Sequence, residues 1–142
     1  MAMNPELPLY IRTLVRGEHD LNDQIEERLD RDGWDGFPRF LASLFFAAVD
    51  RRFGEDALPG EIIRFVAALR EDLSHGGPDI DPIGAEALIK SVLDPTTEYD
   101  LSQEMIGKIQ LATSYKILSE GDLSDAELDE ILAEATEFAM QG

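Results

Sequence analysis

Residues 40–49 read FLASLFFAAV, the most apolar run in the chain. The run belongs to a longer segment, 34–53, in which apolar residues recur at helical spacing and Ala42, Phe46 and Ala47 fill the opposite side. A helix that is apolar around most of its circumference is buried on most sides. We therefore predict that 34–53 is a central helix around which the other elements pack. At ten residues the run is too short to span a membrane.

The same helical spacing recurs on both sides of this segment, and strand alternation is almost absent. Asn4 is the predicted N-cap of the first helix, with Pro5 at its first position and Gly17 at its end. The further predicted helices cover about 18–31, 59–73, 82–93, 102–119 and the segment after Ser124. The fold class predicted is all-α, a single irregular bundle of about six to seven helices around the central one.

Each predicted helix has an apolar stripe that should face the core. The stripes include Leu21, Ile25 and Leu29 in the second helix, Ile63 in the fourth, Tyr115 in the sixth, and Leu128, Ile131, Leu132, Ala135 and Phe138 in the seventh. Ser124 and Glu127 form a capping-box pattern at the start of the seventh helix.

The chain has 142 residues, which fits one domain, 1–142. Its strongest break is the Gly/Pro-rich loop 74–82, SHGGPDIDP. We expect one acidic helical domain with subregions 1–75 and 82–142 joined by this loop.

Charge limits the classes of partner. Asp and Glu number 30 against 12 Lys and Arg, a formal net charge of −18. Direct nucleic-acid binding and docking on an anionic membrane both require a basic surface, so neither is expected. A protein partner that is neutral or basic is compatible with this charge. Beyond Lys116 the sequence holds acids and no base.

Residues that would support catalysis or metal binding are scarce. The chain has no Cys and only two His, His19 and His75. His19 stands beside Asp20, but a metal-dependent phosphohydrolase would need more His and Asp ligands than the sequence provides. We therefore expect no catalytic residues, no cofactor and no metal. The first residues lack a secretory signal pattern, so a cytoplasmic location is expected.

Two surfaces are candidates for binding. The first is an acidic face on the last helix, made of Asp125, Asp129, Glu130, Glu134 and Glu137. The second is an exposed apolar ridge at the central helix, made of Trp34, Phe37 and Phe46. An apolar ridge left uncovered by other helices is typical of an interface.

The function predicted from these features is a non-catalytic helical adaptor that binds a protein partner. One alternative is an acidic mimic of nucleic acid that blocks a basic DNA- or RNA-binding protein, and another is a small helical enzyme. The affinity of a mimic should fall steeply with salt, whereas that of an apolar groove should not. The sequence is also compatible with a homo-oligomer.

Overall fold

The computed structural model describes residues 3–54, 56–74 and 79–141, which form seven helices and no strand. The predicted all-α bundle is therefore confirmed. The helices are α1 (Leu7–Val15), α2 (His19–Asp32), α3 (Phe37–Phe53), α4 (Pro59–Leu73), α5 (Pro82–Leu93), α6 (Gln103–Glu120) and α7 (Asp125–Gln141).

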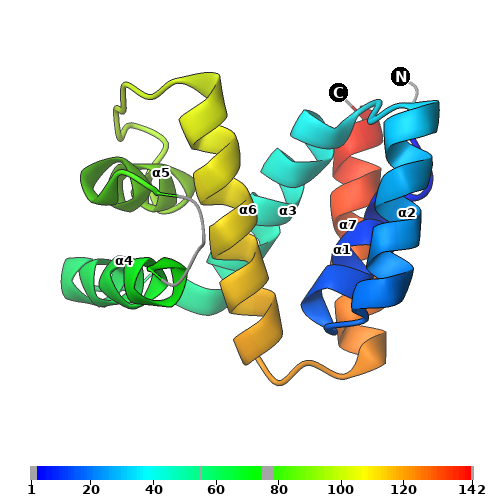
Figure 1. Ribbon diagram of the computed structural model, residues 1–142. Helices are drawn as coiled ribbons and strands as arrows, with labels where there is room; N and C mark the ends of the chain where they lie inside the picture. Colours follow the sequence, from blue (N-terminus) through cyan, green and yellow to red (C-terminus); the bar gives the residue numbers. More distant parts are fainter. Residues whose placement is uncertain (1–2, 55, 75–78, 142) are drawn as a thin grey trace.

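The central position predicted for α3 is confirmed, because this helix contributes to both apolar clusters of the core (Figure 1). Phe40 and Leu44 belong to a cluster with α1, α2, α7 and the end of α6. Val49 and Phe53 belong to a second cluster with α4, α5 and the rest of α6. Each cluster draws on helices from both sides of the loop 74–82.

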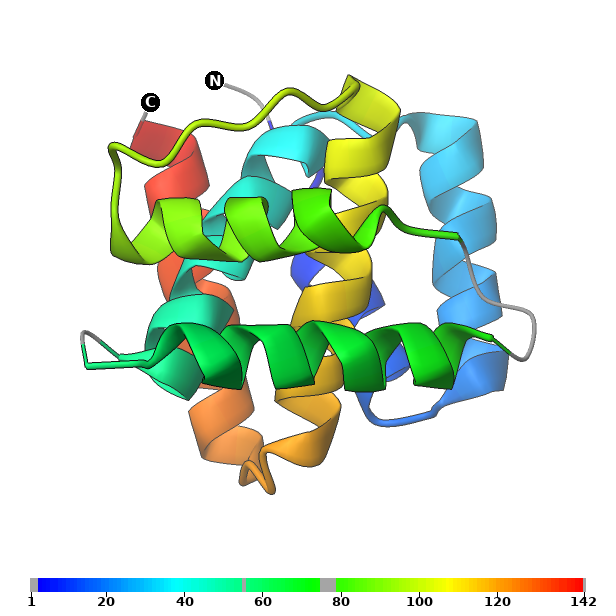
Figure 2. The ribbon, with the colours of Figure 1, turned by 90° about the vertical axis from the view of Figure 1, so that its left-hand side faces the viewer.

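The helices form two groups on either side of α3 and α6. Figure 2 shows α4 and α5 side by side, crossing in front of α3 and α6. On the other side, α1 and α2 pair with each other, and α1 and α3 both contact α7. The last helix of the chain is therefore fixed against the first.

Local sequence signals define several helix ends. Ser102 Oγ accepts a hydrogen bond from the Met105 N–H at 3.1 Å. Ser124 and Glu127 exchange the two capping-box hydrogen bonds, each at 3.1 Å. The predicted N-cap at Asn4 is wrong, because α1 begins at Leu7. Asn4 instead caps a preceding turn and donates its amide to the Gly33 carbonyl at 2.9 Å.

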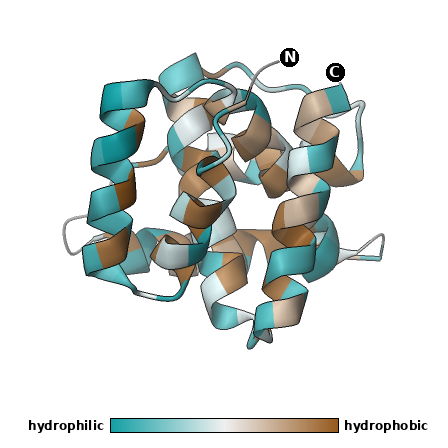
Figure 3. Cartoon of the chain, turned by 90° about the vertical axis from the view of Figure 1, so that its right-hand side faces the viewer, coloured by the Kyte–Doolittle hydropathy of each residue, from teal (hydrophilic) through white to brown (hydrophobic). Residues whose placement is uncertain are grey.

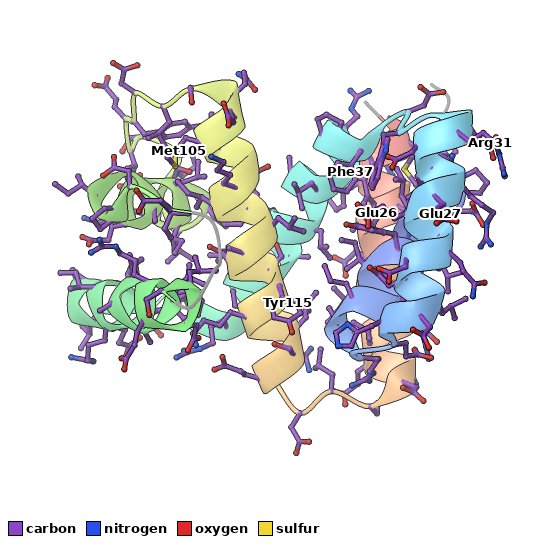
Figure 4. All side chains as sticks on the ribbon, in the orientation of Figure 1. Glu26, Glu27, Arg31, Phe37, Met105 and Tyr115 are labelled. Atoms are coloured by element: carbon purple, nitrogen blue, oxygen red, sulfur yellow. The ribbon has the colours of Figure 1, made fainter. Side chains whose placement is uncertain are left out.

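Four side chains predicted to face the core are exposed: Leu21, Ile63, Phe138 and Tyr115, which is labelled on α6 in Figure 4. In α2 the buried stripe starts one residue later, at Asn22. The Asn22 amide donates to the Tyr10 carbonyl at 2.8 Å and to Thr13 Oγ1 at 3.0 Å, which rotates Leu21 outward. In α4 the buried residues Ile62, Phe65, Val66 and Leu69 leave Ile63 outside the stripe, and in α6 the buried residues lie largely on the side opposite to Tyr115.

Candidate functional site

The predicted acidic residues lie on the outward side of α7. The buried stripe Leu128, Ile131, Leu132 and Ala135 turns the opposite side of this helix to solvent. All five carboxylates of the predicted face are consequently exposed: Asp125, Asp129, Glu130, Glu134 and Glu137.

The N-terminal part of this face is paired with arginines. Arg12 Nε donates to Asp129 Oδ1 at 2.8 Å. Asp125 Oδ1 lies 3.5 Å from Arg12 and 3.2 Å from Arg16. The hydrogen bond to Asp129 raises the pKa of Arg12, so this cation stays charged at any physiological pH. Two of the five carboxylates are thus locally neutralised by α1.

Glu127, just outside the predicted face, is paired in the same way. One of its oxygens accepts from Arg51 at 2.9 Å, and the other accepts from the Ser124 N–H. Hydrogen bonds from Ser124, together with Arg51, lower the pKa of Glu127.

Three carboxylates remain without a charge partner. Within the described part of the chain, Glu130, Glu134 and Glu137 have neither an ion pair nor a side-chain hydrogen bond. Their spacing of four and three residues aligns them on one side of α7 in a row about 10 Å long at the helical rise. They form a row of negative charge that no other described residue compensates.

Apolar grooves flank this row on both sides. The groove between α3 and α7 has a volume of about 310 Å³ and contains Phe46 and Phe138, which are 52% and 60% exposed. The groove between α1 and α7 has a volume of about 800 Å³ and contains Leu9 and Met140, which are 39% and 55% exposed.

These residues together form one surface, which we call the α7 face: Leu9, Phe46, Glu130, Glu134, Glu137, Phe138 and Met140. Figure 3 shows this side of the molecule, with apolar segments on α1 and α7 and a largely hydrophilic α2. Figure 4 shows Arg31 and Glu27 on the side of α2 away from α3, and Glu26 on the side toward Phe37. Four exposed large apolar side chains, Leu9, Phe46, Phe138 and Met140, lie on α7 and its neighbours α1 and α3, and Leu21 is exposed on α2.

The prediction that Phe138 packs inward is wrong. Phe138 follows the buried Ala135 by three residues, which puts it at the edge of the stripe facing α3. On a helical wheel Phe138 lies far from the centre of the buried stripe, and this position was the signal in the sequence that could have predicted its exposure.

The residues Trp34, Phe37 and Phe46 do not form one ridge. Trp34 and Phe37 are half-buried and pack edge-to-face at 5.2 Å, and Tyr10 meets Trp34 at 5.1 Å. Phe46 lies on the opposite side of α3 from Phe37, because the two are two and a half turns apart. Only Phe46 belongs to an exposed apolar surface, and it shares that surface with Phe138.

Comparison with known proteins gives no relative. No family model, no curated protein and no solved structure matches the chain.

Lys116 is a buried cation that sequence reasoning missed. Its Nζ donates to Asp72 and to Glu120, each at 2.6 Å, and lies 5.9 Å from the centre of the Phe65 ring. Burial alone would lower the pKa of Lys116, but the two carboxylates outweigh it and raise the pKa. Lys116 thus ties α6 to the end of α4. The signal in the sequence was the Lys116–Glu120 spacing of four residues.

Other chemistry-bearing residues are dispersed. Among the described residues, no three side chains of the kind that bind metals lie together. His19 is exposed at the start of α2, and His75 lies outside the described residues. None of the described helices combines the length and the apolar character that a membrane crossing requires.

Proposed function

We propose that this protein is a non-catalytic interaction module that binds a protein partner through the α7 face. The observation that carries the proposal is the pairing of two exposed apolar grooves with the uncompensated row Glu130, Glu134 and Glu137. Keeping large apolar side chains in water is unfavourable, so exposed apolar side chains that gather in grooves on one face are typical of an interface.

The composition of the face suits binding to a protein. Aromatic residues and Met are enriched in protein interfaces, and Phe46, Phe138 and Met140 supply them here. Carboxylates at the margin of an apolar contact add specificity and speed association with a partner of opposite charge. The partner in this proposal is a basic protein, and a cytoplasmic meeting place fits a chain without cysteine.

The alternative of a nucleic-acid mimic has less support. A mimic needs many free carboxylates arranged like a phosphate backbone. Arg12, Arg16 and Arg51 pair with three of the acids at the start of α7. The remaining row is short and lies between apolar grooves, which favours a mixed apolar and ionic contact.

Capture from native cell extract tests the proposal. The tagged wild-type protein is compared with the double variant Phe46→Ser/Phe138→Ser and with Ile83→Ser. Ile83 is 76% exposed on α5, away from the α7 face, and is a matched control. We expect a retained partner with the wild type and Ile83→Ser, and its loss with the double variant. Equal capture by all three proteins, with circular dichroism showing all three folded, would refute the proposal.

Salt separates the proposal from the mimic. A partner held through apolar grooves should remain bound when the extract is washed at about 0.5 M salt, since screening removes mainly the ionic contribution. Complete release by salt from the wild type, with the double variant capturing normally at low salt, would favour the mimic.

A further inference from the structure

We propose that the segment of the partner that binds the α7 face is a single basic amphipathic α-helix lying in the groove between α1 and α7. This inference rests on the proposed function and names the chemistry of its partner.

The shape of the groove fits a helix. The groove follows α7 from Asp129 to Gln141 on one side, and Pro5 and the part of α1 up to Arg12 on the other. At the helical rise, the α7 side is about 18 Å long, which matches roughly three turns of a bound helix. Two antiparallel or parallel helices with a groove between them form a common seat for the apolar stripe of a third helix.

The lining of the groove supplies apolar contacts along its length. Leu9 and Met140 stand at its sides, and Leu132, Ala133 and Pro8 complete the apolar part. At one end lie Arg12 and Asp129, which already satisfy each other at 2.8 Å. A partner helix with apolar residues at intervals of three and four would therefore contact apolar side chains along the groove.

The charge row fits the polar side of the same helix. Glu137 itself lines the groove, Glu130 stands on the same outward side of α7, and Glu134 lies one turn from Glu130 at the border with the smaller groove between α3 and α7. Lys or Arg residues spaced by three and four positions along the partner would face these carboxylates. The smaller groove, at Phe46 and Phe138, lies on the side of α7 that faces α3. It can contact a part of the partner outside the bound helix.

The other occupants fit less well. A second copy of this chain would bring the row of three carboxylates against another acidic protein with a net charge of −18. An anionic lipid surface would meet the same repulsion. The same carboxylates that repel a second copy or an anionic lipid surface attract a basic helix.

Synthetic peptides test this inference directly. The first is an 18-residue probe of Leu and Lys with the leucines on one helical face, the second is a shuffled peptide of the same composition, and the third has Glu in place of Lys. Fluorescence anisotropy at 50 mM and 300 mM salt measures the affinity of the folded protein for each. We expect the amphipathic basic peptide to bind at least tenfold more tightly than the shuffled one, and the acidic peptide not to bind.

Two variants of the protein locate the binding. We expect Leu9→Ser/Met140→Ser to weaken binding of the basic peptide about tenfold or more at both salt concentrations, because it removes apolar contacts. We expect Glu130→Gln/Glu134→Gln/Glu137→Gln to weaken it about tenfold at 50 mM salt and less at 300 mM. Matched controls are Ile83→Ser and Glu71→Gln/Glu98→Gln/Asp100→Asn, at exposed positions on other elements.

The outcomes separate the inference from the proposed function. Equal affinity for the amphipathic and shuffled peptides, or unchanged binding by Leu9→Ser/Met140→Ser, would overturn the basic-helix assignment. The proposed function would still stand if capture of the native partner remained sensitive to Phe46→Ser/Phe138→Ser. Dimerisation measured by analytical ultracentrifugation and abolished by Leu9→Ser/Met140→Ser would identify a second copy as the occupant and overturn the inference.

Discussion

Arg12 and Asp129 lie 117 positions apart in the sequence, and the guanidinium Nε of the first donates to a carboxylate oxygen of the second at 2.8 Å. This contact joins the first helix of the chain to the last. It also divides the acids of α7 into those that arginines compensate and those that remain available to a partner.

Removing the charge of the acids that pair with arginine and of the acids that do not should change the free energy of unfolding in opposite directions. Like charges three or four residues apart on a helix repel, so we expect Glu130→Gln/Glu134→Gln/Glu137→Gln to raise the free energy of unfolding by about 0.5 kcal/mol at low salt. The matched variant Asp125→Asn/Asp129→Asn should lower it, because Arg12 and Arg16 lose their partners. Urea unfolding at 20 mM and 300 mM salt measures both, and the two effects should shrink at the higher salt. A change of the same sign in the free energy of unfolding for both variants would contradict the division of the α7 acids into paired and unpaired groups.

The central helix should dominate stability. Leu44 is fully buried, and we expect Leu44→Ala to reduce the free energy of unfolding by about 2–5 kcal/mol through lost burial and the cavity left behind. Phe46→Ala on the same helix is the control, and its cost should stay below about 1 kcal/mol because the ring is half in solvent. Chemical denaturation compares them, and similar losses for the two would mean that α3 is not the core of the bundle.

Glu127 should contribute to the loss of stability in acid. Its pKa is lower in the folded state than in the unfolded chain, because the Ser124 hydrogen bonds and Arg51 favour the carboxylate. The stabilisation of the fold by Glu127 is therefore complete above the unfolded-state pKa of about 4.3, and it is lost as pH falls through the folded-state pKa. Glu127→Gln keeps a capping acceptor but cannot titrate, so its stability should fall less between pH 6 and pH 3. Unfolding curves across this range test it.

Lys116 should stabilise the contact between α4 and α6 chiefly through its aliphatic stem. Its side chain is largely buried, whereas the carboxylates of Asp72 and Glu120 are more than half exposed and can be rehydrated. We expect Lys116→Ala to cost about 2 kcal/mol and Lys116→Met, which keeps the stem, to cost less than about 1 kcal/mol. Thermal unfolding distinguishes them. Equal losses for Lys116→Met and Lys116→Ala would show that the charge, and not the stem, carries the contact.

The sequence was sufficient for local features. Helical spacing located the helices within a few residues, and the Ser124–Glu127 capping box formed as predicted. The near-complete apolar surface of 40–49 identified the central helix, because such a segment has to be covered on several sides. These features depend on residues within a few positions of one another, so the pattern alone contains the information.

The exact orientation of each stripe depended on neighbouring helices. The buried amide of Asn22 needs the Tyr10 carbonyl and the Thr13 hydroxyl, and that requirement turned Leu21 outward. Phe138 ended at an open groove because α3 leaves the edge of the α7 stripe uncovered. Hydrophobic spacing identifies the middle of a buried face, and tertiary packing decides its edges.

By itself, then, the sequence determined the helical architecture, the central helix and the excess of negative charge. Only the tertiary structure decided which acids keep that charge uncompensated, because Arg12, Arg16 and Arg51 reach α7 across more than seventy positions of the chain. It also decided that Phe46 shares a surface with Phe138 while Trp34 and Phe37 pack against Tyr10. The reason is physical: hydrogen bonds within a helix are set by residues a few positions apart, whereas ion pairs and grooves between helices form where the folded chain brings distant residues together.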